Sequence, residues 1–207
     1  MSDVLKDIEM VVFDLMGVII TNSSLVRKGL FTLYGDSYSQ EYIKGLYSEV
    51  RSNREGDSSL WDGLGEGDYH SARARFLGQK YMLNSNFNNI RNFLKERGIQ
   101  MSVLSNMPVS WGDYLCKRFN LNDDFNPKLF SGAVGISKPN RGIFLEFFKQ
   151  ARIDPGKMLF IDDKLKNLKT ASELGMKTVL FSRQDKEKSQ KDFSPDYTIS
   201  SFKELMS

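Results

Sequence analysis

The sequence predicts an α/β fold in which a doubly wound parallel sheet is interrupted by a helical insertion. Short apolar runs, typical of strands buried on both faces, alternate with segments of helical periodicity. The alternation breaks once, at residues 21–87, where apolar residues recur at helical spacing only. With 207 residues, the chain is long enough for one good core and a small accessory domain.

The first half of the predicted core contains three strands. Residues 9–15 form an apolar run that contains a single acid, and residues 100–106 form a second strand. Between them, a helix over 88–97 ends before Gly98, a common C-terminal signal. A helix over 110–119 leads to a short strand at 128–132.

The second half continues the alternation after a loop through Lys138 and Pro139. A helix over 141–151 precedes a buried strand at 157–161, and a helix over 165–174 closes at Gly175. Strands at 178–181 and 197–199 and a short terminal helix complete the chain. Strands that alternate with helices favour a parallel sheet with right-handed crossovers.

The interruption defines the predicted domains. We assign residues 1–20 and 88–207 to the α/β core and residues 21–87 to a helical cap, in which we expect no strand. The insertion follows the first strand directly, where a doubly wound sheet presents its ligand crevice. A helical insert at this point would cover that crevice.

Composition excludes several classes of function. The net charge is +3, and the basic cluster at 183–191 is interleaved with acids, unlike the basic stripe of a nucleic-acid binder. Cys116 is the only cysteine, which rules out an internal disulfide and a cysteine-rich metal site. No signal pattern or membrane-spanning apolar stretch is visible. We therefore expect a cytoplasmic protein with a small-molecule partner, no nucleic acid and no membrane; the oligomeric state stays open.

Acidic residues mark the candidate site. Asp14 lies in the apolar run VVFDLMGVII, and Asp162 and Asp163 end the run MLFIDD. Carboxyl ends of parallel strands share one edge, so these acids are expected to converge. At about 5 Å separation and an effective dielectric of ~20, each pair repels by about 3 kcal/mol, so protons or a cation must offset the repulsion. An all-oxygen site without His or Cys suits Mg²⁺.

The same edge is expected to collect groups that bind an anion. Ser105 and Asn106 end the second strand, and Lys138 lies in the loop after the third. A hydroxyl donor and a cation at one site are suited to an anionic group such as phosphate.

These segments resemble the haloacid dehalogenase-like (HAD) hydrolase superfamily. VVFDLMGVI, VLSN, GISKP and FIDDKLKNLKTASELGM are similar to its four motifs and occur in the same order, with a helical insert where the family has its small cap. The last motif resembles the Asp-Asp-x-x-x-Asn of the phosphatase branch. The resemblance implies a HAD-like Rossmann-type core and a Mg²⁺-dependent phosphatase that hydrolyses a small phosphorylated metabolite.

The resemblance also implies roles for individual residues. Asp14 would be the nucleophile that forms an aspartyl-phosphate. Ser105, with Asn106, would bind the transferring group, and Lys138 would neutralise its charge. The metal ligands would be Asp14, the Met16 backbone carbonyl, Asp162 and Asp163, and Asn167 would orient Lys138 or the acidic pair.

Met16 departs from the family pattern. Most family phosphatases have a second Asp at this position, which protonates the leaving group and then activates water. Without it, a loss of 10²–10⁴-fold in rate is typical, about 3–5 kcal/mol. Three interpretations follow: a phosphatase that uses water, a substrate group or a cap residue such as His70 as the acid; a 2-haloacid dehalogenase; or a non-catalytic phosphate-binding protein.

The acidic pair separates two of these interpretations. Family dehalogenases need no metal, replace the acidic pair with small polar residues and hold halide with a cap arginine. Arg27, Arg51 and Arg54 are available for that role, although basic residues on cap helices are usually solvated. Retention of Asp162 and Asp163 favours a metal, and therefore phosphate chemistry.

Overall fold

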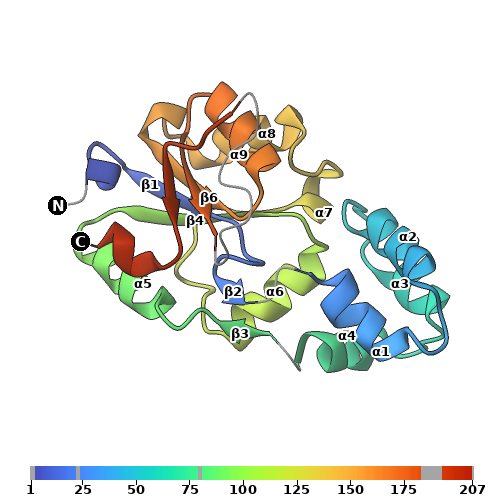
Figure 1. Ribbon diagram of the computed structural model, residues 1–207. Helices are drawn as coiled ribbons and strands as arrows, with labels where there is room; N and C mark the ends of the chain where they lie inside the picture. The colour runs from blue at the N-terminus through green and yellow to red at the C-terminus, as the bar shows by residue number, and fades with distance from the viewer. Residues whose placement is uncertain (1–2, 22–23, 79–80, 183–192, 207) are drawn as a thin grey trace.

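A six-stranded parallel sheet organises the molecule (Figure 1). The computed structural model describes residues 3–21, 24–78, 81–182 and 193–206. In spatial order, the strands are β5 (Lys128–Phe130), β4 (Gln100–Ser105), β1 (Met10–Phe13), β6 (Met158–Asp162), β7 (Lys177–Phe181) and β8 (Tyr197–Ile199). All neighbouring strands are parallel, which confirms the predicted fold class.

Alternating residues of each strand contribute to different cores. In β1, Met10 and Val12 belong to one hydrophobic cluster, whereas Val11 and Phe13 belong to the other. This alternation follows from the two-residue period of side chains along a strand. Because helices cover both faces, the strand is apolar throughout.

Helices form a layer on each face of the sheet (Figure 1). The face of Met10 and Val12 packs against α8 (Arg141–Ala151) and α9 (Leu165–Glu173). The opposite face packs against α5 (Phe87–Glu96), α6 (Val109–Arg118) and the 3-10 helix Phe202–Leu205. Every helix predicted for the core is present within two residues of its expected bounds.

The order of the strands explains where the site lies. From β1, the chain proceeds to β4 and β5 on one side, then crosses to β6, β7 and β8 on the other. β1 is therefore flanked by β4 and β6 at the point where the winding reverses direction. Ligands of open α/β sheets bind at the carboxyl ends of the strands at such a point.

The inserted segment is mainly helical and lies to one side of the sheet (Figure 1). It comprises a π-helix at Val26–Leu30 followed by α1 (Phe31–Tyr34), α2 (Gln40–Val50), α3 (Ser58–Gly63) and α4 (Tyr69–Gly78). Trp111 of α6 packs against Phe76 and Trp61 of the insert, with ring centroids 4.9 and 5.9 Å apart. The two parts therefore share a continuous hydrophobic cluster, and the division at residues 21–87 stays a prediction.

Two local expectations were wrong. The insert contains β3 (Met82–Leu83), which pairs antiparallel with β2 (Ile20–Thr21) where the chain leaves and re-enters the core. A two-residue strand is too short to give a period. The strand expected at 128–132 ends at Phe130, and α7 (Ser131–Val134) begins there. Gly132 lies so close to α6 that an added Cβ would be 3.0 Å from Pro108 Cα.

None of the helices in the described ranges has both the length and the apolar character that a bilayer crossing requires. The basic cluster at 183–191 lies outside the described residues.

Candidate active site

The carboxyl ends of three adjacent strands bring the predicted acids and their partners together. Asp14 is the first residue after β1, and its backbone N–H donates to Ile161 of β6 at 2.9 Å. Ser105 and Asp162 are the last residues of β4 and β6. These three side chains and Lys138 are all buried. Each strand can deliver a polar residue here because the apolar run ends at the sheet edge.

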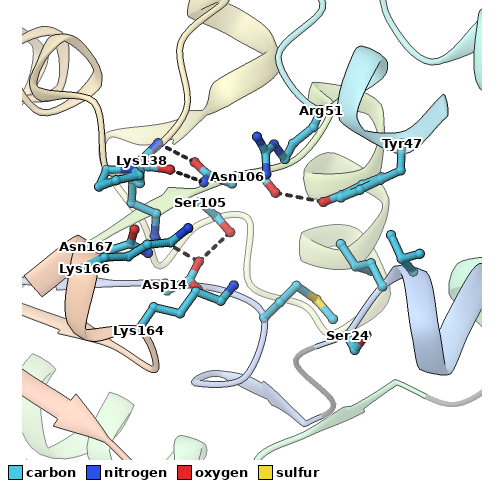
Figure 2. A pocket seen from close by; sticks show the side chains of 14 residues that line it. Asp14, Ser24, Tyr47, Arg51, Ser105, Asn106, Lys138, Lys164, Lys166 and Asn167 are labelled. Atoms are coloured by element: carbon cyan, nitrogen blue, oxygen red, sulfur yellow. Dashed lines mark hydrogen bonds and ion pairs between the residues drawn. The ribbon is translucent and has the colours of Figure 1, made fainter. Parts of the chain in front are cut away.

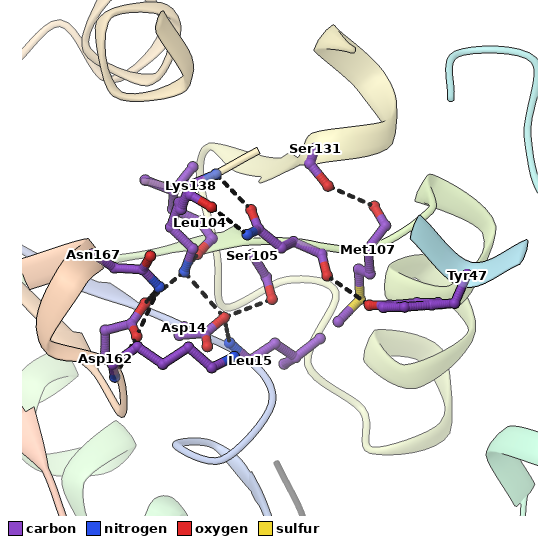
Figure 3. A network of polar contacts seen from close by, with 12 residues as sticks. Asp14, Leu15, Tyr47, Leu104, Ser105, Met107, Ser131, Lys138, Asp162 and Asn167 are labelled. Atoms are coloured by element: carbon purple, nitrogen blue, oxygen red, sulfur yellow. Dashed lines mark hydrogen bonds and ion pairs between the residues drawn. The ribbon is translucent and has the colours of Figure 1, made fainter. Parts of the chain in front are cut away.

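Lys138 is the fixed cation of the site (Figure 3). Its Nζ donates to the Leu104 carbonyl at 2.6 Å and to Asp162 Oδ2 at 2.7 Å, and lies 3.2 Å from Asp14 Oδ1. The three ammonium protons thus have three acceptors. Burial alone would lower the pKa of Lys138, but Asp14 and Asp162 outweigh it and raise the pKa above its usual value. Lys138 therefore remains charged at neutral pH.

The two carboxylate oxygens of Asp14 have different surroundings. Oδ1 accepts from Ser105 Oγ at 2.6 Å and from the Leu15 N–H at 2.8 Å, in addition to the contact with Lys138. No hydrogen bond from the described residues reaches Oδ2. Three donors on one oxygen hold the carboxylate in a single orientation and leave the second oxygen available for chemistry.

Asp162 is saturated with donors. Besides Lys138, the Asn167 amide donates to both of its oxygens at 2.9 and 3.0 Å, and the Lys164 N–H donates at 2.8 Å. Burial, together with the Asp14 charge, raises the pKa of Asp162 against the lowering influence of Lys138. Asn167 thus contacts Asp162, the first member of the acidic pair.

Asp163 has the opposite surroundings. Its Oδ1 is buried without a hydrogen-bond partner among the described residues. Burial, followed by the charges of Asp14 and Asp162, raises the pKa of Asp163 to about 7. Ligand oxygens of the three acids lie within 4.8 Å of one another. An orphaned carboxylate oxygen beside two other carboxylates fits a hard divalent cation, so the residues present suit Mg²⁺.

Asn106 acts on Lys138 through the backbone. Its side-chain amide donates to the Lys138 carbonyl and accepts from the Lys138 N–H, both at 2.8 Å (Figure 3). This pair of bonds holds the loop that carries the lysine. The predicted contact of Asn106 with phosphate stays a prediction.

A cavity of about 290 Å³ opens in front of Asp14 (Figure 2). Asp14, Met16, Ser105, Asn106, Lys138 and Asn167 line it from the core. Sequence reasoning did not identify Tyr47, Lys164 and Lys166 as lining residues, and it treated Arg51 as a residue that is usually solvated. His70 is exposed and does not line this cavity.

Comparisons with known proteins identify similar sequences. A family model described as haloacid dehalogenase-like hydrolase matches residues 8–175. Glyceraldehyde 3-phosphate phosphatase of Methanopyrus kandleri is 30% identical over 118 residues, which cover 55% of this chain and 50% of that protein. Phosphorylated carbohydrates phosphatase of Thermotoga maritima is 21% identical over 181 residues, 83% of each chain. The matched part thus spans half the length of the first relative.

Solved structures share the fold. A HAD phosphatase from Thermococcus onnurineus superposes with a TM-score of 0.73 at 19% identity, covering 96% of both chains. A HAD family enzyme of Bacteroides thetaiotaomicron, solved with magnesium and inorganic phosphate, gives 0.69 at 21% identity over 84% of this chain and 94% of that one. An L-2-haloacid dehalogenase gives 0.71 at 16% identity over 96% and 97%.

Proposed function

This chain belongs to the haloacid dehalogenase-like hydrolase family, and on that premise we propose that it is a Mg²⁺-dependent phosphatase of small phosphorylated metabolites. The observation that carries the proposal is the cluster of Asp14, Asp162 and Asp163, in which Asp163 Oδ1 has no partner among the described residues. The names of two relatives, which are phosphatases of glyceraldehyde 3-phosphate and of phosphorylated carbohydrates, support the substrate class.

Asp14 and Asp163 would hold the metal, with the Met16 backbone carbonyl as a further ligand. Bound Mg²⁺ would supply a Lewis acid that polarises a phosphoryl oxygen. Asp162 would act one step away, because its two oxygens are occupied by Lys138, Asn167 and a backbone N–H. The Asp162 carboxylate would keep Lys138 charged, and its hydrogen bonds would fix the chain that carries Asp163.

The environment of Asp14 suits a nucleophile. Oδ1 is held by Ser105, Lys138 and a backbone N–H, which leaves Oδ2 to attack the phosphorus of the substrate. The bond from phosphorus to the leaving oxygen then breaks, and that oxygen takes a proton. Ser105 and Lys138 would hold the phosphoryl group and offset its charge. Attack by water on the aspartyl-phosphate releases inorganic phosphate and restores the Asp14 carboxylate.

Met16 sets the expected rate. Its side chain lines the cavity beside Asp14 but carries no proton to transfer. His70 is exposed and does not line this cavity, so it is not placed to substitute for the missing acid. Water or a group of the substrate would then protonate the leaving oxygen. A slow phosphatase with a preference for good leaving groups is the expected behaviour.

One observation favours a second candidate function. Arg51 lines the cavity from the cap, as the halide-binding arginine of a 2-haloacid dehalogenase would. Dehalogenation needs no metal, however, and would not explain why Asp162 and Asp163 lie next to Asp14. A non-catalytic phosphate-binding protein would keep the same acids and metal but would give little turnover.

The three candidates differ in their response to metal. The proposed phosphatase releases phosphate from a panel of phosphorylated metabolites with Mg²⁺, stops with chelator, and is inactive as Asp14→Asn. Halide release from a 2-haloacid with chelator present would replace the proposal with dehalogenation. Phosphate binding without turnover, combined with turnover in Met16→Asp, would identify a non-catalytic relative. Asp123→Asn, at an exposed position, is the matched control.

A further inference from the structure

Arg51 is positioned to bind an anion that is not the transferring phosphate. It follows α2 directly, and its main chain is fixed: its N–H donates to the Tyr47 carbonyl at 2.9 Å, and its carbonyl accepts from Ser131 Oγ. Its Nε is buried with no hydrogen-bond partner among the described residues. Arg51 also lines the cavity, and no hydrogen bond or ion pair from the described residues engages its guanidinium group, which can therefore bind an acceptor placed there.

Tyr47 joins the cap to the core at the wall of the cavity that Arg51 also lines. Tyr47 stacks on Trp111 with ring centroids 5.6 Å apart, and its hydroxyl donates to the Asn106 carbonyl at 3.2 Å (Figure 2). Burial raises the pKa of Tyr47, and the charges of Arg51 and Asp14 act on it in opposite directions. Asp14 and Arg51 line the same cavity, so a ligand that fills it can contact both residues.

Two lysines on the core side of the cavity lack a structural explanation. Lys164 and Lys166 occupy the N-terminal end of α9, whose first turn contains no acid. Cations at a helix N-terminus oppose the helix dipole and are unfavourable by a few tenths of a kcal/mol each. Among the described residues, no carboxylate lies within ion-pair distance of either ammonium group. Both lysines line the cavity that Arg51 lines.

The charge balance of the cavity follows from these residues. In the part of the chain that the structure describes, four cationic side chains line the cavity, namely Arg51, Lys138, Lys164 and Lys166, against the one carboxylate of Asp14. Lys138 forms ion pairs with Asp14 and Asp162 at the strand ends. No carboxylate of the described residues lies within ion-pair distance of the other three cations, and their combined field favours a ligand with more than one anionic group.

We propose that the substrate carries a second anionic group, a carboxylate or a second phosphate, and that Arg51 binds it with help from Lys164 and Lys166. This inference rests on the proposed phosphatase function for the position of the first phosphate. Both kinds of anion offer the two adjacent oxygens that a guanidinium fork binds in a bidentate manner. Arg51 is then a specificity-determining residue in the cap.

Binding calorimetry with paired probes tests the proposal without requiring turnover. The full chain is used as Asp14→Asn with Mg²⁺ present. 3-Phosphoglycerate is compared with glycerol 3-phosphate, which replaces the carboxylate by an alcohol. Fructose 1,6-bisphosphate is compared with fructose 6-phosphate, which lacks the second phosphate. The pair with the larger preference identifies the kind of anion.

The proposal expects that, in at least one pair, the probe with two anionic groups binds roughly 10- to 100-fold more tightly than the probe with one. Adding Arg51→Gln should remove the preference while leaving the affinity for the monophosphate nearly unchanged; Arg51→Lys should retain part of it. Arg27→Gln, at an exposed cap position outside the cavity, should change neither.

Two results would overturn the proposal: no preference in either pair, or an Arg51→Gln variant that weakens both members of a pair equally. The second result would assign Arg51 to the transferring phosphate. Absence of turnover in the native protein would contradict the proposed function but would leave this binding result intact. Thermal melting of each variant excludes misfolding as the cause of lost affinity.

Discussion

Asp162 and Asp163 are adjacent in sequence, yet their carboxylates have opposite surroundings. Both oxygens of Asp162 accept hydrogen bonds, whereas Asp163 Oδ1 is buried without a partner among the described residues. Asp162 is the last residue of β6 and contacts Lys138 and Asn167 (Figure 3), whereas Asp163 is the first residue after the strand and has neither contact. One acid thus organises the site, and the other is free for a ligand.

Removal of the free acid should abolish metal binding. We expect Asp163→Asn to lose measurable Mg²⁺ affinity in calorimetry, because the amide offers only one neutral oxygen in place of a carboxylate. The fold should be retained, since no hydrogen bond to Asp163 Oδ1 is lost. Asp123→Asn serves as the control, and an unchanged Mg²⁺ affinity in Asp163→Asn would remove this residue from the proposed ligand set.

Metal affinity should depend on pH around neutrality. In the metal-free protein, burial and the neighbouring acids raise the pKa of Asp163 to about 7, so below that pH the group carries a proton that Mg²⁺ must displace. Affinity should therefore decline by up to about tenfold per pH unit below neutrality and level off above it. Calorimetry in buffers of different ionisation enthalpy counts the released protons; the absence of proton release at about pH 6 would contradict the shifted pKa.

Loss of the buried lysine should destabilise the protein. Lys138→Met keeps the length of the side chain but leaves Asp14 and Asp162 without a cation, and removing one partner of a buried pair costs about 3–5 kcal/mol. The loss should shrink in acid, where the carboxylates are protonated and need no counter-charge. Urea denaturation measures both effects.

A double variant separates charge from packing. Lys138→Met combined with Asp162→Asn should recover part of the lost stability, because the second substitution removes one of the buried carboxylates that the single variant leaves without a counter-charge. Lys149→Met is the surface control: its side chain is 75% exposed, so its ion pair with Glu146 should contribute less than about 1 kcal/mol. Equal losses in the single and double variants would show that Lys138 stabilises through packing alone.

Much of the site could be predicted from the sequence because its residues lie at the ends of buried strands. Asp14, Ser105 and Asp162 each follow or end an apolar run, and the topology of a parallel sheet places such positions together. The cation is harder to predict, since Lys138 lies in a loop and only its order among the motifs indicated its place. The structure adds its three acceptors.

The cap side of the cavity could not be predicted. The orientations of Tyr47 and Arg51 depend on how α2 packs against α6. The spacing of apolar residues identifies the buried face of a helix, but it does not show which of its turns lies next to the ends of the strands. Lys164 and Lys166 did give a signal, because basic residues without acids are unfavourable in the first turn of a helix. The pair β2 and β3 is too short to produce any pattern.

Restoring a carboxyl group two residues after the nucleophile should raise turnover. Met16 lines the cavity, so Met16→Asp would place a proton donor next to the leaving oxygen. General acid catalysis contributes typically 10²–10⁴-fold, and the gain should be largest for alkyl phosphates, whose leaving oxygen must be protonated. p-Nitrophenyl phosphate, with its good leaving group, should gain little. Comparison of kcat/KM for the two substrates measures the effect, because this ratio reports formation of the aspartyl-phosphate and not the later attack by water.

The matched control is Met16→Asn, which is nearly isosteric with Met16→Asp but cannot transfer a proton. It should leave both rates near those of the native protein. A similar gain in Met16→Asn would attribute the increase to altered space in the cavity instead of proton transfer. Loss of activity in both variants would indicate that the methionine side chain itself is needed to hold the substrate.

The interface between cap and core depends on a buried acid outside the cavity. Asp57 accepts from the indole N–H groups of Trp61 and Trp111, both at 2.6 Å, and pairs with Arg73 through two bonds of 2.7 and 2.9 Å. Burial alone would raise the pKa of Asp57, but the hydrogen bonds from Arg73 and the two indoles outweigh it and lower the pKa. This acid therefore links α3, α4 and α6 in its charged form.

Asp57→Ala should destabilise the protein by about 3–5 kcal/mol, because Arg73 and two indole donors lose their acceptor. Since the folded-state pKa is depressed, the contribution of Asp57 is complete above the unfolded pKa of about 3.9 and is lost as the pH falls through the folded value. The difference in unfolding free energy between native protein and variant should thus be constant near neutrality and narrow in acid. Asp62→Ala, at an exposed position on α3, is the control. A pH-independent difference would mean that Asp57 acts through packing and not through its charge.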